Sequence, residues 1–229
     1  MMQSFTKFTK DELVAQMAVF GGNPDKLTMV VIGLATSMAF TSLPLVTEAV
    51  TQGKHRDLAR LINNNFQLYA LLMFPATFGM ILLAYPLNTF FYEPDKLAAK
   101  VLIEACLSGL FVGLFMLTSS TLQGMYYNKA AVKFFAVGIV IKFILQYPCI
   151  LLFQIYGPLL STTIGMAVSC YLNIRQLQQA THFNYKLTLR RILLITILTV
   201  MMLLAAAIAK VVFGLIFSPD HKMTAFLLC

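Results

Sequence analysis

The chain has 229 residues, of which 59% are hydrophobic and 11% are charged, and its formal net charge is +8. Soluble domains carry about 25% charged residues, so a water-soluble core of this size could not hide so much apolar surface. The long apolar runs instead predict an all-α integral membrane protein. Nucleic acid is not expected as a partner, because the basic residues lie beside apolar runs, where they meet the headgroups of membrane lipids.

Residues 1–26 precede the first long apolar run. Residues Thr9–Glu12 fit a capping box, apolar residues then recur near helical spacing, and Gly21–Pro24 is a stop signal. We predict that this segment faces the outside and forms a short amphipathic helix at the membrane interface. The alternative is the remnant of an earlier spanning helix.

Six apolar runs follow, and each predicts a transmembrane helix. The runs are 27–50, 62–92, 97–126, 130–156, 158–174 and 192–217. The second, third and fourth exceed the ~20 residues that cross a bilayer, so we expect these helices to tilt, kink or protrude. Prolines within the runs remove backbone donors and should bend their helices. These prolines are Pro44, Pro75, Pro86 and Pro148.

Lysine and arginine gather in every second break between the runs. Breaks one, three and five hold nine basic residues, and breaks two and four hold two. The nine are Lys54, Arg56, Arg60, Lys129, Lys133, Arg175, Lys186, Arg190 and Arg191. Positive charge marks cytoplasmic loops, so these breaks are predicted inside and both chain ends outside. The predicted domains are the segment 1–26, a helix bundle over 27–178, and 179–229 with a cytoplasmic loop, a further transmembrane helix and an outside tail.

Lys142 lies near the middle of the run 130–156, where a charge is costly unless it faces protein or a water-filled cavity. Gly138, Gln146 and Cys149 share its helical face. One interpretation is a cavity lysine that meets an anionic headgroup or a counter-charge. The other is a structural lysine, paired with a carbonyl or an acid of a neighbouring helix.

Glu48 and Glu104 lie toward the ends of their runs. Either acid could neutralise the buried lysine or line a path, or could lie at headgroup level. Small residues at near four-residue spacing in the third and fifth runs predict close helix packing, static or moving. They are Ala105, Gly109, Gly113, Ser120, Gly124, Ser161, Gly165 and Ser169.

Motifs of enzyme chemistry are missing from the sequence. The three histidines lie in separate loops without ligand spacing, and the four cysteines have no CxxC spacing. We find no P-loop, GxGxxG or GxSxG motif and no carboxylate pair at general-acid spacing. We therefore expect no catalytic residues, no metal and no cofactor.

The order of landmarks along roughly residues 12–191 resembles the multidrug/oligosaccharidyl-lipid/polysaccharide exporter superfamily. The resemblance is strongest to its branch of lipid II flippases and stage V sporulation protein B-like polysaccharide transporters. The residues that carry it are Phe20–Leu27, Leu43–Ala49, Gln52–Lys54, Phe74–Gly79, Leu83–Leu87, Ser119–Gly124 with Asn128 and Lys129, Ile141–Phe143 and Gly157–Gly165.

The resemblance implies a fold of about fourteen helices in two lobes plus a helix pair. This chain would correspond to the second lobe, without most of its first helix, plus the thirteenth helix. The first lobe would then come from a missing part of the same protein or from a partner chain. The implied location is the bacterial cytoplasmic membrane, with several passes across it.

The implied function is a flippase or exporter, not an enzyme, that moves undecaprenyl-pyrophosphate-linked sugars by alternating access. The sugar would be a peptidoglycan precursor or a polysaccharide repeat unit. Lys142, Gln146 and Gln123 would bind the substrate, and Glu48 and Glu104 would serve at a gate or in an ion pair. Two alternatives stay open: a cation-coupled multidrug exporter of the same superfamily, and a membrane scaffold or assembly protein that transports nothing.

Overall fold

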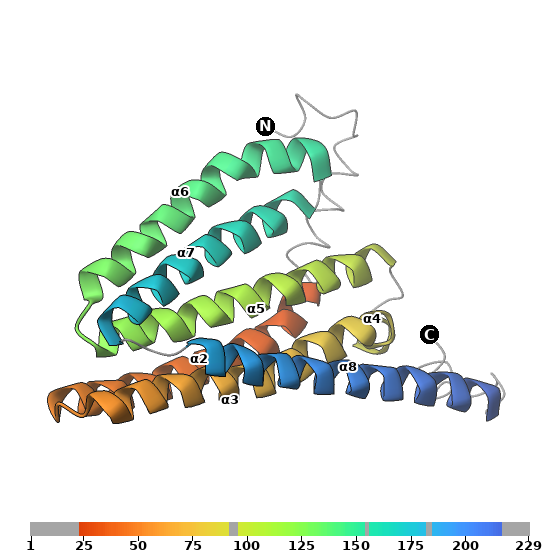
Figure 1. The fold of residues 1–229 in the computed structure, drawn as a ribbon. Coiled ribbons are helices and arrows are strands. Elements are labelled where there is room, and N and C mark those ends of the chain that lie inside the picture. Colours follow the sequence, from red (N-terminus) through yellow and green to blue (C-terminus); the bar gives the residue numbers. More distant parts are fainter. Residues whose placement is uncertain (1–22, 92–95, 154–155, 182–184, 217–229) are drawn as a thin grey trace.

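A computed structural model describes residues 23–91, 96–153, 156–181 and 185–216. Within these ranges the chain forms seven helices and no strand (Figure 1). The helices are α2 (Asn23–Thr51), α3 (His55–Leu82), α4 (Ala84–Phe91), α5 (Lys96–Gly124), α6 (Asn128–Phe153), α7 (Gly157–Thr181) and α8 (Tyr185–Ile216). The amphipathic helix predicted before Asn23 lies outside the described residues.

The prediction of an all-α membrane fold is confirmed. In the described ranges, five of the six apolar runs lie mainly in one helix each, and the second run spans two. α3 and α8 begin at His55 and Tyr185, several residues before their apolar runs, and the first turns of both helices carry polar residues. In the described ranges, four helices are long and apolar enough to cross a membrane. They are Lys26–Thr51, Arg56–Leu82, Ala98–Gly124 and Asn128–Leu152.

The structure divides the second predicted run into two helices, with the break at Leu83. Pro86 explains the break, because its ring would clash with the carbonyl of Leu82, four residues earlier, and it has no N–H to donate. The backbone N–H of Leu83 still bonds to the carbonyl of Gly79 at 3.0 Å. The other three prolines lie inside unbroken helices.

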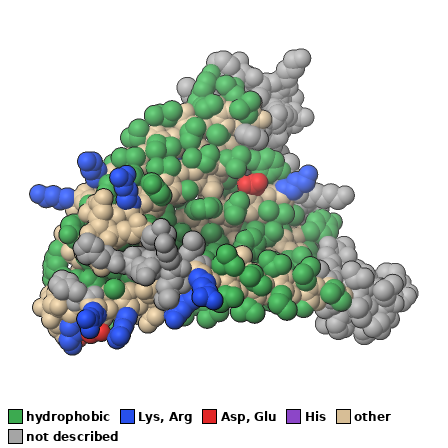
Figure 2. Space-filling model, viewed as in Figure 1, with side chains coloured by type: hydrophobic (Ala, Val, Ile, Leu, Met, Phe, Trp, Pro, Cys, Tyr) green, Lys and Arg blue, Asp and Glu red, His purple; other side chains and the backbone are tan. Residues whose placement is uncertain are grey.

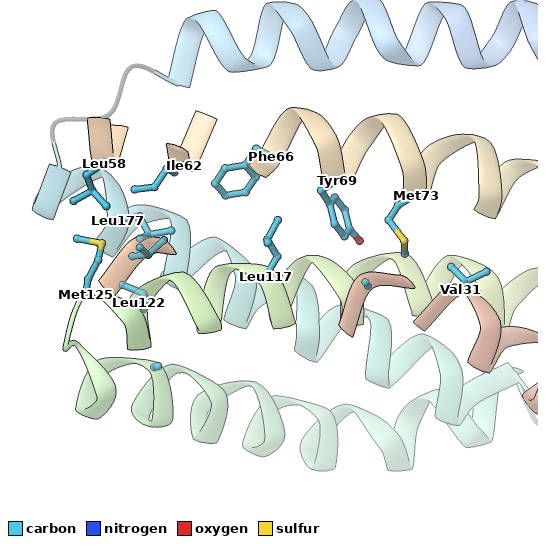
Figure 3. Packing of buried hydrophobic residues seen from close by; sticks show 13 residues of the cluster. Val31, Leu58, Ile62, Phe66, Tyr69, Met73, Leu117, Leu122, Met125 and Leu177 are labelled. Carbon is cyan, nitrogen blue, oxygen red and sulfur yellow. The ribbon is translucent and has the colours of Figure 1, made fainter. Parts of the chain in front are cut away.

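The apolar core lies between α2, α3 and α5 (Figure 3). Phe66, Tyr69 and Met73 of α3 point toward Leu117 of α5 and Val31 of α2, and all five side chains are buried. Lipid is as apolar as this core, so such contacts stabilise the bundle by close packing more than by removing surface from water. α5 is the central helix, in contact with α2, α3 and α7.

Tyr69 joins two of these helices by a hydrogen bond. Its hydroxyl donates to the carbonyl of Leu110 at 2.5 Å. The ring fits because Gly113 has no side chain: a Cβ there would lie 2.9 Å from the Tyr69 oxygen and 2.6 Å from the Cβ of Ala35. One of the small residues predicted to bring helices together thus makes room where α2, α3 and α5 meet.

α6 and α7 form a hairpin that joins the bundle through α7, while α8 lies along α3 (Figure 1). The α2–α3 and α5–α6 connections and the last turns of α7 lie at one end of the bundle, to the left in Figure 1. Lysine and arginine side chains gather at this end (Figure 2). We keep the prediction that this end faces the cytoplasm, and call it the basic end.

Candidate functional site

The two helices of the hairpin approach so closely that their backbones touch. A Cβ on Gly138 of α6 would overlap the hydroxyl of Ser169 and lie 2.7 Å from the carbonyl oxygen of Gly165. The Ser169 hydroxyl donates to the carbonyls of Phe134, at 3.0 Å, and of Gly165, at 3.1 Å. We call this contact between α6 and α7 the glycine seam. It forms because small residues of both helices meet at helical spacing.

Lys142 lies one turn from Gly138, at the edge of the glycine seam. A Cβ on Gly165 would come 3.1 Å from the Cβ of Lys142, so the lysine stem leaves α6 toward α7. The residue is half-buried. In the described part of the chain the one ion pair joins Arg60 to Asp57, so no acid found there neutralises Lys142.

Gln146 lies one turn beyond Lys142 and is also half-buried, as is Cys149 after it. The opposite face of α6 is exposed and apolar: Phe143 and Ile144 are each 68% exposed. The predicted stripe of small and polar residues therefore lies on the protein side of α6, and the outer face is available to lipid.

The other predicted site residues lie apart from Lys142. Gln123 is exposed at the end of α5, where its amide donates to the Ser119 hydroxyl at 3.3 Å. Lys142 lies about 20 Å along α6 from that end of the bundle, because an α-helix rises 1.5 Å per residue. Glu48 is exposed near the end of α2 and accepts a hydrogen bond from the Gln52 amide at 2.9 Å.

Glu104 lies in the half of α5 away from the basic end and is half-buried. The structure thus brings Lys142 and Gln146 together and leaves Gln123, Glu48 and Glu104 at three other places.

A buried polar contact between α5 and α7 was not predicted from the sequence. Asn173 of α7 is fully buried, and its amide donates to the hydroxyl of Thr118 at 3.1 Å. Its carbonyl oxygen accepts no hydrogen bond from the described residues. Two features could have drawn attention to it: an asparagine late in an apolar run, and the hydroxyl-rich stretch Thr118–Thr121.

The described helices hold no group of three or more His, Cys, Asp or Glu residues placed to bind a metal ion. The cysteines described there, Cys106, Cys149 and Cys170, are free thiols. What the arrangement offers is a cation and an amide on the protein face of a helix within an apolar bundle.

A family model and one curated relative agree on a family. The family model described as "Lipid II flippase MurJ" matches residues 25–224. The chain is 32% identical over 205 residues to "Lipid II flippase MurJ" of Bacillus subtilis (strain 168), which covers 87% of this chain and 38% of that protein. It is also 25% identical over 145 residues to "Uncharacterized membrane protein YabM" of the same strain, a match that covers 63% of this chain and 27% of that protein.

A solved structure has the same fold. "Lipid II flippase MurJ, inward closed conformation" superposes with a TM-score of 0.65 at 16% identity, over 93% of this chain and 49% of that one. This chain therefore spans less than half the length of the relatives that it matches.

Together, the helices and this superposition define a multi-pass, all-α membrane protein with the fold of a transporter. Within that class, the chain belongs to the lipid II flippase MurJ family, whose model covers most of its length. The expected membership of the exporter superfamily and of its lipid II flippase branch is confirmed. The chain is a protein of the bacterial cytoplasmic membrane, and the matched family is one of flippases rather than enzymes.

Proposed function

We propose that this chain forms part of a flippase that moves undecaprenyl-pyrophosphate-linked sugars, such as a peptidoglycan precursor, across the cytoplasmic membrane. The family match supports the proposal. So does Lys142, a cation in the membrane-spanning part of α6 with no acidic partner among the described residues. Intramembrane cations without a partner are costly and commonly serve a substrate path.

Lys142 would attract the pyrophosphate of the substrate into the bundle. A positive site with low-dielectric walls concentrates anions, and a pyrophosphate offers the counter-charge that the described residues do not. Gln146, one turn away on the same face, would hydrogen-bond pyrophosphate or sugar. Gln123 at the basic end would meet the substrate as it enters, and Glu48 and Glu104 would act at opposite ends of the path as gate or ion-pair residues.

A second lobe would complete the path. The matched relatives are more than twice as long as the region that they share with this chain. α6 is attached to the bundle mainly through α7 and has a large exposed apolar face. We propose that another helical lobe, from the same protein or a partner, faces this hairpin and that the two lobes alternate access around it.

The test measures movement of a fluorescent undecaprenyl-pyrophosphate sugar between the leaflets of vesicles. The vesicles would contain this chain alone, or this chain joined to the whole part of the Bacillus subtilis relative that lies before the region matched by this chain. We expect the joined protein to move the lipid, Lys142→Ala to slow it at least tenfold, and Lys142→Arg to keep part of the rate. Lys100→Ala, which removes an exposed lysine at the start of α5, is the matched control.

The results distinguish the flippase from the two alternatives, a multidrug exporter and a membrane scaffold. If the joined protein exports a lipophilic cation instead of the lipid, it is a multidrug exporter. Binding without movement of either compound would support a scaffold. Normal movement by Lys142→Ala would keep the flippase and remove Lys142 from its substrate path.

A further inference from the structure

A second cluster of charge lies at the start of α6, away from Lys142. An open groove of about 420 Å³ is lined there by Asn128, Lys129, Val132 and Lys133. The groove is shallow, and all four residues come from the first two turns of α6. We call it the α6 groove. The proposed lipid path makes no use of these four residues, which are all exposed.

The charge of the α6 groove is positive and unbalanced. Lys129 and Lys133 are four residues apart, so they share one helical face, where like charges repel each other. Neither forms an ion pair with the described residues. The first backbone N–H groups of any helix lack partners within it and form the positive end of its dipole. In α6 the N–H groups of Ala130 and Ala131 already donate to the Tyr127 carbonyl, so the two lysines and the helix dipole are what favour a bound anion.

The turn before α6 places two tyrosines on the surface beside the groove. Tyr126 has φ +65°, a conformation in which glycine is usual. Its N–H donates to Gln123 and that of Tyr127 to Leu122, each at 2.9 Å, which ends α5 in a Schellman motif. The rings are 64% and 41% exposed. Exposed tyrosines next to lysines at a helix end are typical of the headgroup level of a bilayer.

An apolar surface leads from the groove toward the membrane centre. Val132, which lines the groove, is 66% exposed, and Phe135 follows one turn later at 37%. Val140 and Phe143 continue the exposed apolar surface of the same helix. A free phosphate would use only the charged part of this surface, whereas a lipid would use both parts.

We propose that the α6 groove binds the phosphodiester headgroup of an anionic phospholipid, with an acyl chain along Val132 and Phe135. Lys129 and Lys133 hold the phosphate between them, which removes their mutual repulsion. The tyrosines keep this end of α6 at headgroup depth. The site would hold a structural or regulatory lipid of the basic-end leaflet, and it does not depend on the proposed transport.

The experiment is a lipid titration of the purified 229-residue chain in detergent, with bound molecules counted by native mass spectrometry. The probes are phosphatidylglycerol, zwitterionic phosphatidylcholine with the same acyl chains, and glycerol 3-phosphate without chains. Lys129→Gln/Lys133→Gln tests the groove, and Lys129→Arg/Lys133→Arg keeps its charge. Lys54→Gln/Arg56→Gln removes two exposed charges from the same end of the bundle and is the matched control. Circular dichroism checks the helix content of each variant.

We expect the wild-type chain to bind phosphatidylglycerol most tightly. A lysine near a membrane surface contributes about 1 kcal/mol to anionic-lipid binding, so the double glutamine variant should bind about 30-fold more weakly. The double arginine variant and the control should stay within about threefold of wild type. Three results would overturn the proposal: equal binding of phosphatidylcholine, equal binding of glycerol 3-phosphate, or an equal loss in the Lys54→Gln/Arg56→Gln control.

Discussion

The helix α5 and the hairpin helix α6 are similar in length and hydropathy, yet they are packed in opposite ways. In the most apolar stretch of α5, 56% of the residues are buried, against 6% in α6. α5 contacts α2, α3 and α7, and its interface with α3 includes the Tyr69 hydrogen bond. α6 packs mainly against α7, touches α5 through the stacked rings of Phe115 and Phe135, and presents most of its remaining surface outward.

The difference separates the part of the molecule that holds the bundle together from the part that can carry a function. Around α5, two buried hydrogen bonds join helices, from Tyr69 to Leu110 and from Asn173 to Thr118. Hydroxyls of α5 also donate to carbonyls of their own helix. α6 instead carries Lys142, a charge without an ionic partner among the described residues. A static bundle has no need for such a charge, because its cost falls on the stability of the protein.

The largest expected effect comes from Gly138→Ala in the glycine seam. The new Cβ would overlap Ser169 and press on the carbonyl of Gly165, so the helices must separate. We expect a loss of about 2–3 kcal/mol, as for overpacked cores, measured by thermal unfolding in nanodiscs. Gly33→Ala, with nothing within 4 Å of its Cβ, is the control and should be neutral or stabilising. Equal behaviour of the two variants would refute the close contact.

Lys142→Met should change stability in the opposite direction. Replacing a half-buried cation that has no ionic partner by an apolar side chain of similar length should raise the free energy of unfolding by about 1–2 kcal/mol. The same substitution should slow lipid movement in the joined protein. A loss of stability would instead identify Lys142 as the structural lysine of the alternative interpretation. Lys100→Met, at an exposed position, should change stability by less than about 0.5 kcal/mol.

Tyr69→Phe tests the contact that holds α3 against α5. It removes the hydrogen bond to the carbonyl of Leu110 and leaves the packing of the ring intact. Hydrogen bonds between membrane helices contribute about 0.6 kcal/mol on average, so we expect a loss of about 0.6–1 kcal/mol. Tyr171→Phe, at a position 64% exposed, should change nothing measurable in the same unfolding assay.

The smallest effect is expected where α8 meets α3. The Arg191 guanidinium donates to the Gln67 carbonyl oxygen at 2.9 Å, and the arginine is exposed. Arg191→Gln should therefore shift the unfolding midpoint little, within the ~0.5 kcal/mol typical of surface changes. A larger loss would mean that this contact, rather than apolar packing, holds α8 to the bundle.

Much of the fold could be predicted because its signals are local. The break at Leu83 is an exception, because the sequence predicted the same bend at all four prolines, and three of them lie inside unbroken helices. Elsewhere, apolar runs of sufficient length mark the helices. Lys142 was found for the same reason: a charge within an apolar run is visible without any knowledge of its neighbours.

The contacts between helices could not be predicted in the same way. The sequence shows that Gly138 and Gly165 are small, but not that they face each other. The partner of Asn173 is 55 residues away along the chain and is set by how α7 lies on α5. For the same reason, only part of the proposed site could be predicted. Helical spacing places Lys142 next to Gln146, but it says nothing about the distance between Lys142 and Gln123.

The glycine seam also limits how Lys142 could change its position. With backbones in contact at Gly138 and Gly165, neither helix of the hairpin can rotate about its own axis without driving side chains into the other. Any displacement of the Lys142 backbone would then carry α7 with it. Spin labels on α6 and α7 would keep a constant separation. The distance from either helix to α2 would measure how far the hairpin moves relative to the bundle.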